Sequence, residues 1–114
     1  MENSLAIVTA KRKSAPDMGI VNAELSAEGW LPRDLMRLSK AMPQATSDYV
    51  DSTNLEAAKL VQALEALFNE PTASESLPAF IKMAEQVLLP TLSSPYNDRL
   101  YLAALCVVTF HEAI

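Results

Sequence analysis

A chain of 114 residues has the size of one domain, and with half of its residues hydrophobic it can build a core, which excludes extensive intrinsic disorder. Only two glycines occur, both early in the chain, which is too few for the many turns of a β-sandwich or barrel. The formal net charge of −5 resides in the later part: residues 1–40 carry six basic and five acidic side chains (net +1), and residues 41–114 carry three basic and nine acidic ones (net −6). Residues 41–114 are therefore too acidic to form a basic stripe, which is typical of a protein that binds the nucleic-acid backbone.

We predict a flexible N-terminal arm over residues 1–16, followed by a single helical domain over residues 17–114. The apolar stretch Leu5–Val8 precedes the basic cluster Lys11–Lys13, which is the reverse of the order in a secretory signal. A mobile terminus is the simpler interpretation. The alternative is an arm that packs on a second subunit or partner.

The first helix is predicted over residues 17–28, because Val21 and Leu25 share a face and Gly29 suits the position after a helix end. A second helix is predicted to start at Pro32, which favours a first turn. Its apolar seam has helical spacing, and Pro43 is predicted to end it; the seam is formed by Leu31, Leu35, Leu38 and Met42. We expect residues 43–52 to form a polar loop.

The third helix is predicted over residues 53–69, with Thr53 as its N-cap in a capping box with Glu56. Ser76 is predicted to cap a fourth helix over residues 77–89. A fifth helix is expected to begin at Ser94–Pro95 and to continue to the chain end. Its run from Leu100 to Phe110 is apolar on all sides apart from Thr109, so it must be covered on all sides. Since this run is too short to span a bilayer, we expect it at the centre of the domain.

No residue set in the sequence predicts a specific chemistry. His111 is interpreted as a last-turn histidine and Cys106 as a small buried hydrophobic residue, because the two lie on different faces of the helix. Asp48 and Asp51 are interpreted as turn and cap residues of one loop. The single cysteine excludes an intramolecular disulfide and a Cys-based zinc site.

Six basic residues are the best candidates for nucleic-acid contact, if the arm folds against the second helix: Lys11, Arg12, Lys13, Arg33, Arg37 and Lys40. Acidic residues nearby and the usual solvation of charge runs weigh against this interpretation.

These features predict an all-α fold, a compact bundle of four or five short helices around an apolar C-terminal helix. We expect a non-catalytic, cytoplasmic adaptor, inhibitor or regulator that needs no cofactor and binds a protein partner or a second copy of itself, with no membrane contact. Its partner interface is predicted on the last two helices, at Phe80, Met83, Val87, Tyr101 and Val108. The alternatives are a nucleic-acid-associated regulator that uses the basic residues, and a small hydrolase that uses His111 or Cys106.

Overall fold

The computed structural model describes residues 16–51 and 53–113, and this part of the chain folds as a compact all-α bundle, as predicted. It contains five α-helices and no strand. The helices are α2 (Met18–Ala27), α3 (Pro32–Val50), α4 (Leu55–Phe68), α5 (Leu77–Val87) and α6 (Arg99–Ala113), with the short 3-10 turns η1 (Ala73–Glu75) and η2 (Leu89–Thr91) on either side of α5. Apart from Pro16, the predicted N-terminal arm lies outside the described residues.

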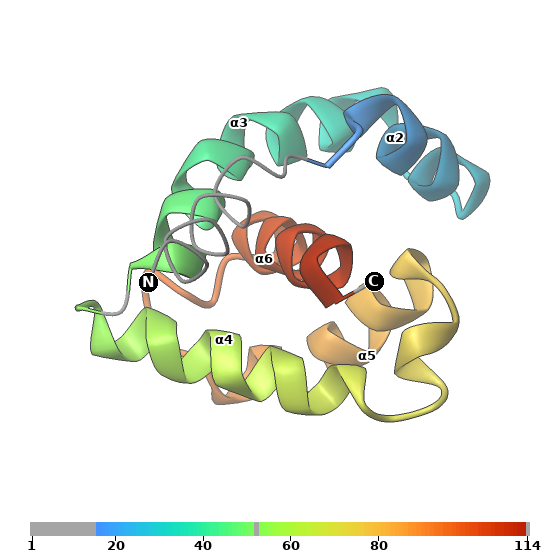
Figure 1. Cartoon of the computed structure of the whole chain (residues 1–114). Coiled ribbons are helices and arrows are strands. Elements are labelled where there is room, and N and C mark those ends of the chain that lie inside the picture. The colour runs from blue at the N-terminus through green and yellow to red at the C-terminus, as the bar shows by residue number, and fades with distance from the viewer. Residues whose placement is uncertain (1–15, 52, 114) are drawn as a thin grey trace, which may run out of the picture.

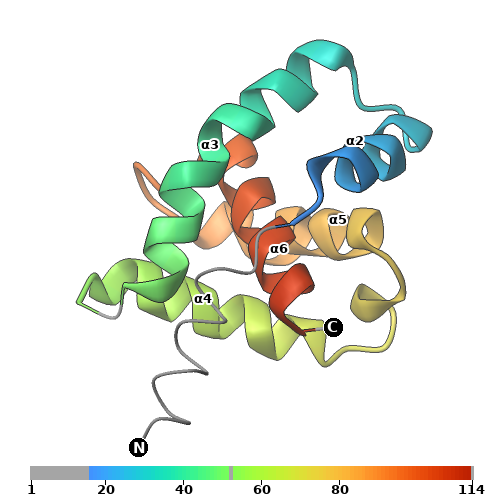
Figure 2. The same ribbon diagram turned by 45° about the horizontal axis from the view of Figure 1, so that its top comes forward.

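Helix α6 is the centre of the bundle. Figures 1 and 2 show it enclosed by α3, α4 and α5, with α2 crossing beside α5. From Leu102 to Thr109 no residue of α6 is more than 4% exposed. The predicted central position of the apolar C-terminal helix is therefore confirmed, and α6 is covered within a single chain.

Helix α2 lies one residue inside the predicted bounds at each end, with Asp17 and Glu28 as its cap residues. The Asp17 carboxylate caps it by accepting hydrogen bonds from the backbone N–H of Gly19 (2.9 Å) and of Ile20 (3.4 Å). At the other end the Trp30 N–H donates to the Leu25 carbonyl and the Gly29 N–H to the Ser26 carbonyl, which is a Schellman motif. Gly29 adopts φ +97°, a conformation that a side chain would strain.

Helix α3 corrects the prediction that Pro43 ends a helix and that a polar loop follows. The helix continues through Pro43 to Val50. Proline removes one backbone hydrogen bond and costs about 3 kcal/mol inside a helix. Here the helical path buries Ala45 and Tyr49 in line with Leu38 and Met42, so that the apolar seam extends by two turns. This burial favours the long helix over the loop.

Helix α4 buries one face, with Ala57, Leu60, Val61 and Leu64 in the core. Its N-cap corrects the sequence prediction: the side-chain Oδ1 of Asn54 accepts the Ala57 N–H at 3.2 Å, in the place assigned to Thr53. The Thr53 hydroxyl instead donates to Asp51 at 2.6 Å, outside the helix. Both residue types are good caps, and the Asp51–Thr53 turn decides which one takes the position.

We predict that Asn54→Ala lowers the free energy of unfolding by about 1 kcal/mol through loss of the α4 cap. Thr53→Ala removes only an exposed hydroxyl bond and should cost less. Chemical denaturation of both variants measures the difference. A larger loss in Thr53→Ala than in Asn54→Ala would contradict the cap assignment.

Helices α5 and α6 lie where the sequence predicts them, but not all of their ends match the predicted ones. Ser76 caps α5 as predicted, its hydroxyl accepting the Ala79 N–H at 3.3 Å. Helix α6 begins at Arg99, five residues after the predicted Ser94 cap. Its first turn is capped by Asp98, whose carboxylate accepts the Leu100 N–H at 2.9 Å. The Ser–Pro pair belongs to the turn before the helix.

Candidate functional site

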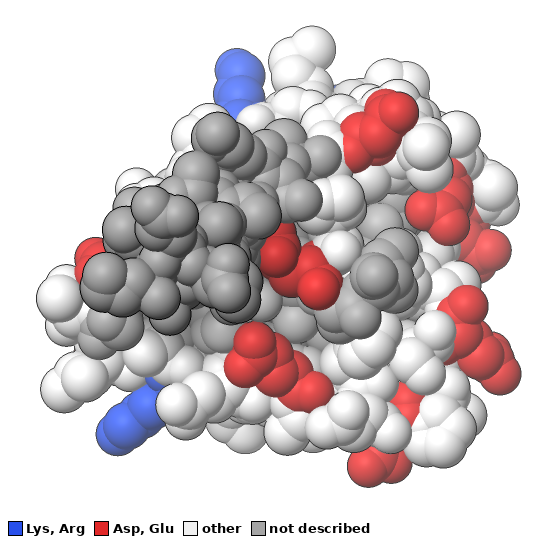
Figure 3. Space-filling view, in the orientation of Figure 1, with Lys and Arg blue, Asp and Glu red and all other residues white. Residues whose placement is uncertain are grey.

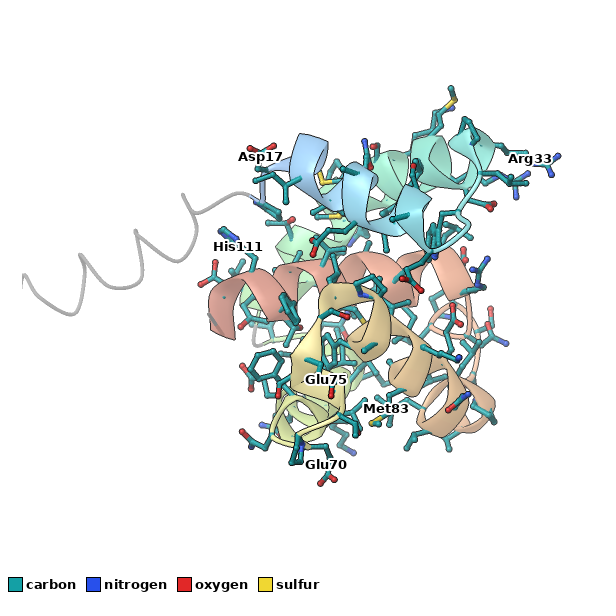
Figure 4. All side chains as sticks on the ribbon, turned by 90° about the vertical axis from the view of Figure 1, so that its right-hand side faces the viewer. Asp17, Arg33, Glu70, Glu75, Met83 and His111 are labelled. Carbon is teal, nitrogen blue, oxygen red and sulfur yellow. The ribbon has the colours of Figure 1, made fainter. Side chains whose placement is uncertain are left out.

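An apolar cavity of about 220 Å³ lies where α2, α5 and α6 meet. Its apolar wall is formed by Ile20 and Val21 from α2, Leu77 from α5, and Val107 and Phe110 from α6. Its rim also includes Pro16, Asp17, Glu24 and His111. We call these nine residues the α2–α6 cavity. Figure 4 shows Asp17 and His111 on the same side of the molecule, at the start of α2 and near the end of α6.

The outer face of α2 places an apolar side chain among carboxylates at this cavity. Ile20 is 60% exposed. Asp17, Glu24 and Glu28 are also exposed, and with Ile20 they follow helical spacing along one face. Helix α2 contains no lysine or arginine. Among the described residues on the face in Figure 3, acidic side chains are widespread and basic ones lie at the margins. The cavity is thus an apolar opening beside a negatively charged ridge.

Two of the predicted partner-interface residues are part of the core. Phe80 is fully buried and Val108 is 4% exposed. The Phe80 ring packs edge-to-face on Phe68 (centroids 5.6 Å apart), and Phe110 completes the aromatic cluster at 5.4 Å from Phe68 and 6.1 Å from Phe80. Since these side chains already fill the interior, Phe80 and Val108 cannot line a docking surface.

The other three residues of that predicted interface are more accessible, but they do not form a surface together with Phe80 and Val108. Val87 is 52% exposed, and Met83 and Tyr101 are partly buried against the core. The Tyr101 hydroxyl donates to Asp48 at 2.6 Å, which directs it towards α3. The predicted set is therefore not one surface.

The residues predicted for nucleic-acid contact are only partly placed. Arg33, Arg37 and Lys40 are exposed on α3, whereas Lys11–Lys13 lie outside the described residues. In Figure 4, Arg33 lies on the opposite side of the molecule from Asp17. The patch of six cations stays a prediction, which a salt-dependent mobility shift with duplex DNA or RNA tests.

Cys106 lies in the core, as the sequence suggests, and is not positioned as a nucleophile. The side chain is fully buried. Burial, with a smaller contribution from the Glu85 charge, raises the pKa of the Cys106 thiol far above its ordinary value. The thiol is therefore protonated at neutral pH, and His111, at the rim of the α2–α6 cavity, lies five residues away along the helix.

We predict that stability falls above about pH 9.0, the ordinary pKa of a cysteine thiol. Because the pKa of Cys106 is raised in the folded state, its contribution is complete below that pH and is lost as the unfolded chain ionises. Burial also raises the pKa of Tyr49 and Tyr101, so a further fall is expected above pH 10.0. Urea denaturation across pH 7–11 measures both steps, and Cys106→Ala should remove the first. A first step that persists in Cys106→Ala would contradict the assignment.

Sequence reasoning missed a polar network in which α3, α4 and the start of α6 meet. Asp48, 7% exposed in the last turn of α3, accepts hydrogen bonds from Gln44 (2.9 Å) and from Tyr101 (2.6 Å). Asn54, which caps α4, donates to the Tyr96 hydroxyl at 2.9 Å. Asp48 was predicted to lie in a loop with Asp51, and it lies instead inside a helix. The spacing of Gln44 and Asp48 is a helical signal, but the predicted end at Pro43 concealed it.

Within residues 16–51 and 53–113, no three His, Cys, Asp or Glu side chains are arranged to hold a metal ion. None of the helices in this part is both long enough and apolar enough to cross a bilayer. Comparison with protein-family models, with curated proteins and with solved structures finds no match to the chain.

Proposed function

We propose that this protein is a non-catalytic adaptor, inhibitor or regulator that binds a basic amphipathic segment of a partner protein at the α2–α6 cavity. The observation that supports this proposal is the 60% exposed Ile20 beside an apolar opening and between the carboxylates of Asp17 and Glu24. The free, buried thiol of Cys106 suits a reducing compartment, and we propose the cytoplasm.

The apolar part of the cavity favours a side chain that enters it as an anchor. Its wall is formed by aliphatic groups and the Phe110 ring. Grooves of this kind between helices bind amphipathic helices whose apolar residues recur at i, i+3, i+4 and i+7. The exposed Ile20 lies where a second apolar residue of such a helix would pack.

The acidic side chains beside the cavity favour a partner whose polar face is basic. Asp17, Glu24 and Glu28 give this face of α2 a negative charge, and the helix has no basic residue that offsets it. Lysine or arginine residues that flank the anchor of a partner would face these carboxylates. Attraction of this kind accelerates association and weakens with salt, because the charges are exposed.

The test uses a synthetic, labelled peptide with leucines on one helical face and lysines on the other, and fluorescence anisotropy as the measurement. We expect binding to the full chain that weakens as salt rises. The double variant Asp17→Asn/Glu24→Gln should bind about threefold to tenfold more weakly at low salt. Asparagine at position 17 keeps a capping oxygen, so the variant should fold normally.

The matched control is Glu70→Gln/Glu75→Gln, which changes the net charge by the same amount at sites that Figure 4 shows far from Asp17. Its affinity should equal that of the unmodified chain. Equal loss in both double variants, or equal binding of a peptide with glutamates in place of the lysines, would overturn the proposal.

Two other occupants of the cavity are distinguished in the same experiment. A second copy of the chain would appear as a dimer in light scattering, and the peptide would dissociate it. If residues 1–15 occupy the cavity, deleting them should strengthen peptide binding while the mass stays that of a monomer. Either result would replace the partner proposed above.

A further inference from the structure

A second cavity, of about 310 Å³, opens between the end of α3, the start of α4 and the start of α6. Gln44, Asp48, Asn54, Tyr96, Asp98 and Tyr101 line it. Figure 1 shows the end of α3 next to the start of α4, with the segment that leads into α6 passing beside both. This cavity shares no lining residue with the α2–α6 cavity.

The buried carboxylate of Asp48 accepts hydrogen bonds, and no side chain within residues 16–51 and 53–113 forms an ion pair with it. Its two oxygens accept from the amide of Gln44 and the hydroxyl of Tyr101, which are both neutral. Among the described residues, the ion pair that the structure shows joins Arg99 to Glu85 and does not involve Asp48. Buried charges in proteins are usually paired, because desolvation without a counter-charge is costly. A cation in the adjacent cavity would supply the missing charge.

The rest of the lining has the chemistry that binds an organic cation. The rings of Tyr96 and Tyr101 lie 5.8 Å apart and inclined at 56°, and aromatic faces attract cations. Asp98 adds a second carboxylate at the exposed edge. Among the residues that the structure describes, no lysine, arginine or histidine lines the cavity. Its volume is at the lower end of ligand pockets, which suits a small ligand.

We propose that this cavity binds a small primary ammonium group, either of a free amine or of a lysine side chain. The ammonium would lie against Asp48, with its alkyl chain along the tyrosine rings and towards Asp98. Oxygen atoms of the carboxylates and of the polar side chains would accept its N–H groups. This site is independent of the proposed docking of a basic segment at α2.

The test uses butylamine as the probe, with butanol as its neutral analogue, and observes the tyrosine ring resonances by NMR. We expect saturable, millimolar binding of butylammonium that shifts the Tyr96 and Tyr101 signals, and at least tenfold weaker binding of butanol. A comparison with Nα-acetyl-lysine methylamide identifies the source. Tighter binding of the lysine derivative favours a protein side chain, tighter binding of butylamine favours a free amine, and both results support the site.

Three variants locate the charge that binds. Asp48→Asn should weaken butylammonium at least tenfold. Asp98→Asn, at the exposed edge, should weaken it about threefold and keeps the α6 cap, so it provides a readout even if Asp48→Asn unfolds. Asp51→Asn, one turn beyond the cavity at an exposed position, should leave the affinity unchanged. Absence of binding, equal binding of butanol, or equal affinities in the Asp98→Asn and Asp51→Asn variants would overturn the proposal.

Discussion

Leu105→Asp should abolish cooperative folding. Leu105 is fully buried in the middle of α6, with buried residues on both sides from Leu102 to Thr109. An aspartate there has no water and no cationic partner, and burying an unpaired carboxylate costs more than most domains can tolerate. The net stability of a domain is only about 5–15 kcal/mol. Circular dichroism and thermal denaturation measure the expected loss of the folded state.

The matched control is Leu55→Asp, the same substitution at a residue that is 71% exposed. Leu55 is the first residue of α4, where a carboxylate is favoured by the helix dipole. This variant should fold with unchanged or slightly raised stability. If Leu105→Asp instead folded cooperatively as a monomer, α6 would have to be peripheral, contrary to the structure.

Phe80→Ala should destabilise the protein strongly without changing its charge. The side chain is fully buried and its ring contacts those of Phe68 and Phe110. Truncation of a buried phenylalanine leaves a cavity and typically costs about 3–5 kcal/mol. Urea denaturation of the folded variant measures this loss directly.

Val87→Ala is the control from the same predicted interface, and at 52% exposure it should change stability by less than about 0.5 kcal/mol. A small loss of stability in Phe80→Ala, together with weaker self-association, would restore the interpretation of Phe80 as an interface residue. The measured difference between the two variants therefore separates a core role from a docking role.

Helical periodicity was sufficient to predict most of the bundle. The rows in α4 and α5 and the all-round apolar run of α6 are local patterns, and burial follows from them directly. The errors fall where tertiary contacts outweigh local signals. Pro43 disfavours a helix by itself, but the packing of Ala45 and Tyr49 in the core favours a helix that continues beyond it.

The two cavities could not be predicted from the sequence. Asp48 and Tyr101 are 53 positions apart, and nothing in the local pattern of either indicates that they form a hydrogen bond. Ile20 looks like any apolar residue of an amphipathic helix. Its 60% exposure depends on how α2 packs against α3 and α5, which no local pattern determines. Phe80 was predicted at a partner interface, whereas the structure encloses it with the Phe68 and Phe110 rings, and no local pattern indicates those contacts.

The most direct test of the proposed function is a methyl NMR spectrum of the isoleucine-labelled chain during titration with the lysine-rich amphipathic peptide. Ile20 lines the α2–α6 cavity, whereas Ile81 is 3% exposed in the core and serves as an internal reference. We predict a saturable shift of the Ile20 methyl signal, an unchanged Ile81 signal, and loss of the effect with the glutamate peptide. An Ile20 signal that stays in place while the peptide binds would contradict docking at this cavity.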